Sequence, residues 1–313
     1  MQTFLPVPDF LDGARLLDSP RLGKQRVETL QILRAIELPD YGWANHPAVL
    51  MWRGRTPALV AYGLAMVTAW QERGFADSTQ AQIAEFAPEV VGVAQAELAA
   101  AGLLPSWLGD DALHRSHRSN LLAKDPEFYR AQFTGRFGPE PADLPYVWPP
   151  ADPVEPEPEP AGVGVWVLRP RSHGEMGACL LTGVIGLGTK SGIDVDATGL
   201  APAELRTLSF ELTGRRPAKD LRQLSAFLDD VHPGDPVAVP IQHGTALLLG
   251  EVTGSYRFEG RELLPHRRPV RWAGIAPRAA APRPATLQDP RALFSVLFDP
   301  AALDRAGLVQ RCG

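Results

Sequence analysis

A proline- and glutamate-rich segment divides this chain. Residues 149–164 read PPADPVEPEPEPAGVG, with Glu and Pro alternating through the middle. Proline extends the backbone and alternating Glu-Pro cannot pack into a core, so such a segment acts as a semi-rigid spacer. With 313 residues the chain is long enough for two domains. We therefore expect one domain on each side of the spacer; the alternative is a surface loop within a single domain.

Before the spacer the hydrophobic pattern is helical. Apolar residues recur at helical spacing, and Ser19-Pro20 is a good start for the first long helix. The pattern predicts a mostly α-helical domain over residues 1–148. Its expected helices cover residues 10–17, 20–37, 57–73, 89–101 and 116–133.

After the spacer the apolar runs become short, as is typical of strands. We expect an α+β domain over residues 165–280, most simply a small β-barrel crossed by helices. The remainder, residues 281–313, is expected to form a helical tail. The expected strands are 165–168, 184–187, 236–240, 246–252 and 270–275, and the expected helices are 202–212 and 220–228.

Composition limits the classes of function. A net charge of −5 excludes a globally basic nucleic-acid coat but permits a local basic site. The two cysteines, Cys179 and Cys312, cannot form a disulfide framework or a Cys-rich zinc site, which favours a reducing cytoplasm. No apolar run approaches the roughly 18–20 residues of a membrane span, and the N-terminus lacks a signal-peptide pattern. We expect a cytoplasmic protein with no membrane partner and no obligate protein partner.

Three polar clusters in the first domain are candidates for chemistry. In the first cluster, helical spacing places Asp18, Arg21, Gln25 and Glu28 on one face, with Lys24 beside them. One interpretation is a solvated face with ordinary ion pairs. The other is a carboxylate among cations, suited to an anionic substrate such as DNA phosphate.

The second cluster combines aromatic and basic residues. Trp43, His46, Trp52 and Arg53 suit base stacking together with phosphate contact. A tryptophan-anchored loop that closes a helical core explains the same composition. The two interpretations stay open on composition alone.

The third cluster is the stretch HRSHRSN over residues 114–120. His114 and His117 share a helical face, but no third histidine is close in sequence, and the only nearby acids are Asp110 and Asp111. We therefore predict no metal ion and no cofactor. A basic strip that includes Arg118 and contacts phosphate or caps a helix is the favoured interpretation.

Four segments of the first domain resemble the pyrimidine-dimer DNA glycosylase family, the phage-type endonuclease V. The similarity covers about residues 1–135, and the stretch RLGKQRVE over residues 21–28 resembles a bacterial branch of the family. It implies a compact helical DNA glycosylase with AP-lyase activity. The segments are Leu17–Arg21, Trp43–Tyr62, Glu72–Phe75 and Asp125–Tyr129.

The resemblance implies a mechanism. An N-terminal amine attacks the sugar C1′, the base leaves, and a Schiff base forms, while a carboxylate near a Pro-Arg step stabilises the sugar cation. Asp18 stands at that step, where the family has Glu, and Arg21 matches the arginine that holds phosphate beside a flipped nucleotide. The residues expected to contact DNA are Arg21, Arg26, His46, Trp52, Arg53, His114, His117 and Arg118.

The nucleophile has three candidates. The family exposes the amine of a small second residue by removing the initiator Met, whereas here the second residue is the bulky Gln2, which normally keeps Met1 in place. The amine is then that of Met1. Lys24 as a Schiff-base lysine is the second candidate, and water activated by Asp18, with no lyase step, is the third.

Six blocks of the second domain resemble the PUA-like superfamily, most closely the EVE-like modules fused to modification-dependent restriction nucleases. The similarity covers about residues 163–278 and implies a β-barrel that holds a flipped modified base between aromatic side chains. Barrel core is the alternative for the two tryptophans. The expected reader residues are Trp166, Arg169, Tyr256, His266 and Trp272, and the blocks are Val165–Arg169, Gly183–Gly188, Gln223–Phe227, His232–Val237, Gly250–Tyr256 and His266–Trp272.

Together the two resemblances predict a DNA glycosylase, with AP-lyase activity as an option, that excises a modified or damaged base. The second domain would direct it to modified DNA, in phage restriction or in DNA repair. Two competing classes are a non-catalytic sensor that only binds modified nucleic acid and a reader of RNA modifications.

Overall fold

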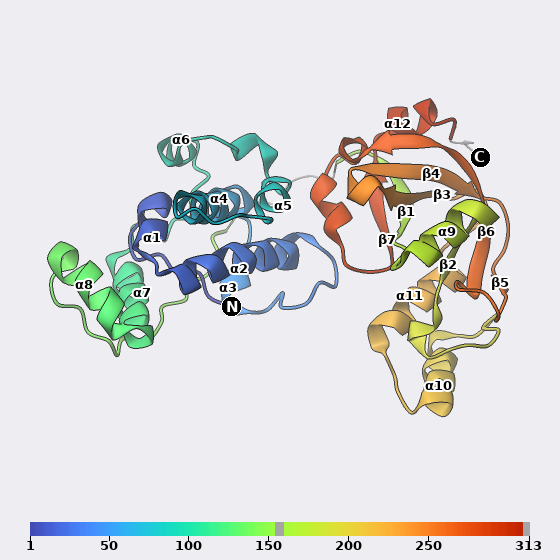
Figure 1. Ribbon diagram of the computed structural model, residues 1–313, viewed down its shortest axis with the longest axis horizontal. Helices are drawn as coiled ribbons and strands as arrows, with labels where there is room; N and C mark the ends of the chain where they lie inside the picture. Colours follow the sequence, from blue (N-terminus) through green and yellow to red (C-terminus); the bar gives the residue numbers. More distant parts are fainter. Residues whose placement is uncertain (154–159, 309–313) are drawn as a thin grey trace. The chain divides into compact units, whose positions relative to one another are not determined.

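The computed structural model describes residues 1–153 and 160–308 and divides the chain into two compact units (Figure 1). The first unit is Met1–Pro158 and the second is Glu159–Gly313. The centre of the expected spacer and the last five residues, with Cys312, lie outside the described residues. A helical unit followed by a strand-rich unit agrees with the two-domain expectation.

The first unit is helical and closes around one hydrophobic core. Helices α2 and α4 form its centre, and α1 packs against α4. No helix within residues 1–153 or 160–308 is long and apolar enough to cross a membrane. The helices are α1 (Phe10–Leu16), α2 (Ser19–Glu37), α3 (Pro47–Leu50), α4 (Thr56–Glu72), α5 (Gln80–Ala84), the 3₁₀ turn η1 (Pro88–Val90), α6 (Gln95–Ala100), α7 (Asp111–Lys124) and α8 (Pro126–Phe137).

Capping residues and glycines set the helix boundaries. Asp18 caps α2 because its Oδ1 accepts a hydrogen bond from the Arg21 amide at 2.7 Å. Asp125 caps α8 in the same way, and it separates α7 from α8 where we expected one helix over 116–133. The expected helix over 89–101 is also wrong as a single element: Gly92, at φ +80°, interrupts it between η1 and α6.

The second unit is built on a mixed sheet. Across residues 160–308 seven strands run in the order β2-β6-β4-β3-β1-β7, with β5 paired to β6. Strands β1 and β3 are parallel, and the other pairs are antiparallel. The elements are β1 (Val163–Leu168), α9 (His173–Thr182), β2 (Val184–Leu187), η2 (Thr189–Ser191), α10 (Pro202–Thr213), α11 (Ala218–Asp229), β3 (Pro236–Ile241), η3 (Gln242–Gly244), β4 (Ala246–Val252), β5 (Arg257–Phe258), β6 (His266–Pro277), η4 (Arg278–Ala280), η5 (Pro284–Gln288), β7 (Leu293–Phe298) and α12 (Pro300–Arg305).

Two expectations for this unit are corrected. The sheet is open, because β2 and β7 end the strand order without pairing to each other in the described residues, so the expected closed barrel is wrong. The expected helical tail is also wrong over 293–298, where β7 pairs with β1 along its whole length. Its sequence LFSVLF is rich in side chains that favour strands.

Both faces of the sheet are covered, which explains the apolar runs of its central strands. Along β1, Val165 and Val167 pack into one core cluster, while Trp166 and Leu168 pack into the other. Helix α11 covers the second of these faces with Leu224 and its neighbours, and α12 covers the first.

Candidate functional site

The start of the chain crosses the first unit as an extended segment whose backbone is held by side chains. Gln25 of α2 makes the central contacts: its Oε1 accepts from the Phe4 amide at 2.9 Å, and its Nε2 donates to the Gln2 carbonyl at 3.0 Å. The Tyr62 hydroxyl of α4 donates to the same Oε1 at 2.6 Å. Only 1% of Gln25 is exposed. Its side-chain amide therefore satisfies a buried backbone N–H and a C=O of the extended segment, as the backbone of a neighbouring strand would.

Helix α7 holds the next two residues. His117 Nδ1 accepts from the Leu5 amide at 3.0 Å, and His114 Nδ1 donates to the Leu5 carbonyl at 2.8 Å. Arg118 donates to the Pro6 carbonyl at 2.8 Å. All three side chains are buried, which corrects our expectation that this strip contacts DNA.

Burial also decides the charge of the two histidines. It lowers the pKa of His117 to about 3 and lowers the pKa of His114 in the same direction. Both rings are therefore neutral near pH 7. Each has a nitrogen that accepts from a backbone amide, that of Leu5 for His117 and that of Gly109, at 3.1 Å, for His114, and only a neutral ring can accept. The favoured interpretation, a strip that contacts phosphate or caps a helix, is replaced by fixation of the N-terminal segment.

Aromatic residues complete the hold on this segment. Trp52 Nε1 donates to Thr3 Oγ1 at 3.1 Å, and the Tyr146 hydroxyl donates to the Thr3 carbonyl. Trp52 is fully buried, so it packs in the core and cannot stack on a DNA base as predicted. The second cluster thus contains one core tryptophan and one exposed tryptophan, Trp43.

This arrangement places the N-terminal α-amine beside a buried carboxylate. The Met1 nitrogen lies 3.9 Å from Glu28 Oε1, and each of the two side chains is only 8% exposed. Glu28 also accepts from Gln25 Nε2 at 3.1 Å and from the Gln2 amide at 3.4 Å. Lys24 Nζ lies 3.6 Å from Glu28 Oε1 with its side chain 70% exposed. The carboxylate is therefore surrounded by cations and donors.

An open pocket of about 600 Å³ lies over this group. Its walls come from the N-terminal segment, the first three turns of α2, the end of α7 and the segment after α8. The pocket brings together two of the three predicted catalytic residues with a carboxylate that we had placed only on the same helix face. It is lined by Met1, Gln2, Phe4, Pro20, Arg21, Lys24, Gln25, Glu28, Lys124 and Trp148.

Asp18, the third predicted catalytic residue, does not line the pocket. Its Oδ1 caps α2, and its Oδ2 pairs with Arg21 at 2.6 Å. Arg21 donates as well to the Lys124 carbonyl at 3.1 Å, which ties α2 to the end of α7. Both oxygens of Asp18 are thus engaged, and the carboxylate that faces the amine is Glu28. Helical spacing predicted that Asp18 and Glu28 lie on one face of the helix. It could not predict which of the two carboxylates lies beside the N-terminal amine.

Two further residues predicted to contact DNA lie away from the pocket. Arg26 pairs with Asp77, and its guanidinium lies 4.1 Å from the centre of the Trp70 ring, so it is a packed ion pair rather than a phosphate contact. Arg53 is exposed and donates to the Ala44 carbonyl at 2.9 Å. Arg53 therefore remains accessible to a phosphate, in the turn between α3 and α4 and beside Ala44 of the loop that joins α2 to α3.

His46 has a structural partner and lies next to the pocket wall. Its Nδ1 accepts from the Ala48 amide at 3.1 Å and so caps α3, and burial lowers its pKa. Its ring contacts Trp148, with centroids 6.0 Å apart. Of the residues predicted to contact DNA, Arg21 alone lines the pocket, and His46 reaches it through Trp148.

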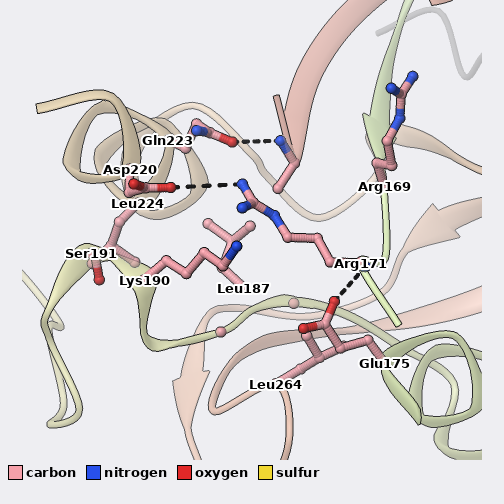
Figure 2. Close-up of a pocket in the computed structure, with 13 residues that line it drawn as sticks. Arg169, Arg171, Glu175, Leu187, Lys190, Ser191, Asp220, Gln223, Leu224 and Leu264 are labelled. Atoms are coloured by element: carbon pink, nitrogen blue, oxygen red, sulfur yellow. Dashed lines mark hydrogen bonds and ion pairs between the residues drawn. The ribbon is translucent and has the colours of Figure 1, made fainter. Parts of the chain in front are cut away.

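The second unit has a pocket of its own, between the end of β1, α9, the turn after β2, and α11 (Figure 2). Arg171 and Lys190 extend into it, and Arg171 lies 3.7 Å from Asp220. The Arg171 amide donates to Glu175 at 2.6 Å. Arg169 also lines the pocket, but its guanidinium points away and donates to a carbonyl of η5. The apolar part of the lining includes Leu187, Leu224, Leu264 and Ala292.

The predicted reader residues mostly serve packing. Tyr256 donates to His266 Nδ1 at 2.9 Å and accepts from the Ala197 amide at 3.3 Å, while His266 Nε2 donates to the Ile193 carbonyl at 2.9 Å. His266 is fully buried, and burial lowers its pKa. The pair fastens the loop over 193–197 to β6, which corrects the expectation of an open aromatic cage.

The two tryptophans expected to sandwich a base also pack against the core. Trp166 and Trp272 are half-buried against the cluster covered by α11. Trp272 Nε1 donates to the Cys179 carbonyl of α9 at 3.1 Å. Of the five predicted reader residues, Arg169 alone lines the pocket of this unit.

Comparison with known proteins connects the first pocket to a chemistry. Residues 172–281 match a family described as a domain of unknown function, DUF8426. Neither the curated proteins nor the solved structures contain a match. Residues 1–83 match the family described as pyrimidine dimer DNA glycosylase, and this segment includes Met1, Lys24, Gln25 and Glu28. The match supports a DNA glycosylase-type enzyme that acts on DNA.

Proposed function

We propose that the first unit is a DNA glycosylase whose nucleophile is the α-amine of Met1 and whose catalytic carboxylate is Glu28. The observation that supports this most directly is the fixed N-terminal segment. Buried side chains from α2, α4 and α7 bind its backbone and leave the amine 3.9 Å from Glu28 at the floor of an open pocket. Placing a nucleophile in this way lowers the entropic part of a reaction barrier.

The chemistry follows from these two groups. The neutral amine attacks C1′ of the sugar, the C1′–base bond breaks, and its electron pair leaves with the base. Glu28 accepts the proton that the amine loses, can deliver it to the departing base, and stabilises the positive charge that develops at C1′. The C1′–O4′ bond then breaks and O4′ takes a proton from solvent, which opens the sugar ring and leaves a Schiff base. Removal of a C2′ proton by Glu28 or water breaks the C3′–O bond and expels the 3′ phosphate, and this β-elimination is the AP-lyase activity.

The cations at the pocket fit the substrate backbone. Arg21, Lys24 and Lys124 all line the pocket and can contact phosphates beside a flipped nucleotide. Lys24 is also the competing nucleophile, since its Nζ lies 3.6 Å from Glu28 Oε1, slightly closer than the Met1 nitrogen at 3.9 Å. Its 70% exposure favours a role in phosphate contact.

Borohydride trapping on DNA with an abasic site tests this proposal. We expect a covalent adduct whose peptide map places the sugar on Met1, with Lys24→Ala trapping normally. Glu28→Gln should lower the trapping and base-release rates by about 10²–10³-fold. Asp18→Asn is the matched control, because Asn also caps helices, and it should trap nearly as well as the wild type.

Four results would contradict the proposal. An adduct on Lys24 would identify Lys24, and not the Met1 amine, as the nucleophile. Normal rates in the Glu28→Gln variant would show that Glu28 is not the catalytic carboxylate. Base release without any adduct would indicate a water-using glycosylase. Neither adduct nor base release on a panel of damaged and modified DNAs would favour the non-catalytic sensor.

We also propose that the second unit recognises the altered base, through the pocket of Figure 2 rather than through an aromatic cage. The pocket combines apolar side chains with the donors Arg171 and Lys190 and the acceptors Glu175 and Asp220. A heterocyclic base has the same character, with apolar faces and a polar edge. The unit would direct the glycosylase to modified DNA, in phage restriction or repair.

Competition binding tests the reader role. Lys190→Ala should lower the preference for modified over unmodified DNA and leave trapping at bare abasic sites unchanged. Matched DNA and RNA probes separate this from RNA reading, because the 2′-hydroxyl distinguishes them. A variant with unchanged preference would contradict the assignment of this pocket.

A further inference from the structure

Trp43 exposes an apolar ring on a loop beside the first pocket. The residue is 66% exposed, in the loop that joins α2 to α3. Its backbone has φ +63°, and Asp40 and Gly42 in the same loop have φ +57° and +97°. Positive φ is unfavourable for a bulky residue, and an exposed indole gains little from the hydrophobic effect. Neither backbone preference nor burial therefore accounts for a tryptophan here.

The loop is nevertheless well supported. The Trp43 carbonyl accepts from the His46 amide at 2.8 Å, and Arg53 donates to the adjacent Ala44 carbonyl at 2.9 Å. The Trp43 ring meets the His46 ring edge-to-face, with centroids 5.8 Å apart. The ring is thus held in one place, with most of its surface open to a partner.

A row of aromatic rings connects Trp43 to the pocket. The His46 ring meets Trp148 at 6.0 Å, and Trp148 packs on Tyr146 at 4.2 Å. Trp148 lines the pocket in which the Met1 amine lies. Trp43 therefore lies two ring contacts from Trp148 and the pocket wall.

The charges around this ring suit DNA. Arg53 is exposed and bonds to Ala44 next to it, and the exposed Lys24 and Lys124 line the pocket, so cations that can contact phosphates lie at both ends of the aromatic row. When a nucleotide leaves the duplex, a neighbouring or opposite base loses its stacking partner. An exposed aromatic ring replaces that partner with little dependence on sequence.

We propose that Trp43 stacks on the base that is left unstacked when a nucleotide of double-stranded DNA enters the pocket. This inference rests on the proposed function, and it adds a base-binding residue outside the pocket. Trp43 contributes affinity for the distorted duplex and takes no part in bond breaking.

Binding to a duplex with a tetrahydrofuran abasic analogue, placed opposite 2-aminopurine, tests the proposal. The analogue cannot form a Schiff base, so the measurement reports binding alone. Trp43→Ala should weaken binding about tenfold or more and abolish the stacking quench of 2-aminopurine. Trp43→Phe should keep most of both. Phe75→Ala, which removes another exposed aromatic of this unit, should keep both as well.

The outcome separates this inference from the glycosylase proposal. If Trp43→Ala keeps wild-type affinity and quenching, stacking by Trp43 is refuted, whatever the trapping assay shows. The same holds if the wild type does not bind the analogue. Weakened binding by the variant, with no adduct from the wild type on abasic DNA, would support stacking and refute the proposed chemistry.

Discussion

Both units bury a network of neutral histidine and amide groups, but the two networks hold different things. In the first unit Gln25, His114 and His117 bind the backbone of the chain's first residues and leave its amine in a pocket. In the second unit Tyr256 and His266 bind a loop to β6, and neither of them lines the pocket. Hydrogen bonds of the same kind thus hold the N-terminal amine in a pocket in the first unit and anchor a loop in the second.

The comparison shows that residue type alone does not identify a site. Histidines next to arginine predicted a DNA surface in the first unit, and tyrosine with histidine predicted a reader in the second. In both cases the polar atoms are used by the protein's own backbone. The two networks differ in the segment that they hold. In the first unit the segment ends in the α-amine of Met1, whereas in the second unit it is a loop without such a group.

The largest expected effect comes from deleting the segment after α8, at the end of the first unit. A fragment over residues 1–158 should trap abasic DNA like the full chain, because the unit has its own core. A fragment that ends at Val147 loses Trp148 from the pocket wall and Asp152, which accepts from Arg55 at 2.8 Å and from the Ser106 amide at 2.9 Å.

Loss of this half-buried partner, which bonds to a guanidinium and a backbone amide, should lower the free energy of unfolding by about 1.5–3 kcal/mol, measured by urea denaturation. Equal stability and trapping of the two fragments would show that the segment after α8 is dispensable. If fragment 1–158 did not trap abasic DNA while the full chain did, the first unit would need the second unit for catalysis, contrary to the proposal.

The next effect concerns the hold on the N-terminal segment. Gln25→Ala frees the Gln2 and Phe4 backbone, so the amine is no longer fixed beside Glu28. We expect the single-turnover trapping rate to fall about 100-fold. Binding of the tetrahydrofuran analogue should change little, because Gln25 positions the amine. The exposed Gln71→Ala is the control, and a rate loss no larger than its own would contradict the positioning role.

A smaller effect follows from the lowered pKa of His117. The pKa is about 3 in the folded protein and about 6.5 in the unfolded chain, so between these values the unfolded state binds the extra proton. Stability is therefore lost as the pH falls below about 6.5, by about 2 kcal/mol at pH 5.

His117→Asn tests this directly, because the Asn oxygen can accept from the Leu5 amide but does not titrate there. In fragment 1–158 the difference in unfolding free energy between pH 7 and pH 5 should shrink by that amount. An unchanged difference would assign the pH dependence to other groups, such as His114.

The smallest expected effect lies in the second unit. Tyr256→Phe removes the hydroxyl that donates to His266 and should cost about 1–2 kcal/mol of stability. It should change neither trapping nor the preference for modified DNA. A lost preference without lost stability would restore Tyr256 as a reader and would break the contrast between the two networks.

Much of the fold could be predicted from periodicity. The helical repeat located α2 and α4 within one residue at each end, and apolar runs located β2 and β4. Strand β7 and helix α9 could not be predicted in this way. The first is apolar on both faces and so has no alternation, and the second carries two glycines in ten residues.

The candidate site could be predicted only in part. Spacing placed Gln25 and Glu28 on one helix face with Arg21, but the choice between Asp18 and Glu28 depends on the path of the N-terminal segment. That path is set by contacts with α7, more than a hundred residues away in sequence. Spacing identifies a helix face; it does not identify what packs against it.

The burial of Met1 bears on how this protein should be prepared. An affinity tag fused ahead of Met1 would turn the α-amine into an amide, which is not nucleophilic, and its residues would have to enter a space where Met1 and Glu28 are each 8% exposed. An acetyl cap would block the same atom. A tag at the carboxyl end leaves the amine intact. If the Met1 amine is the nucleophile, as proposed, only a protein with a free N-terminus will form the borohydride adduct.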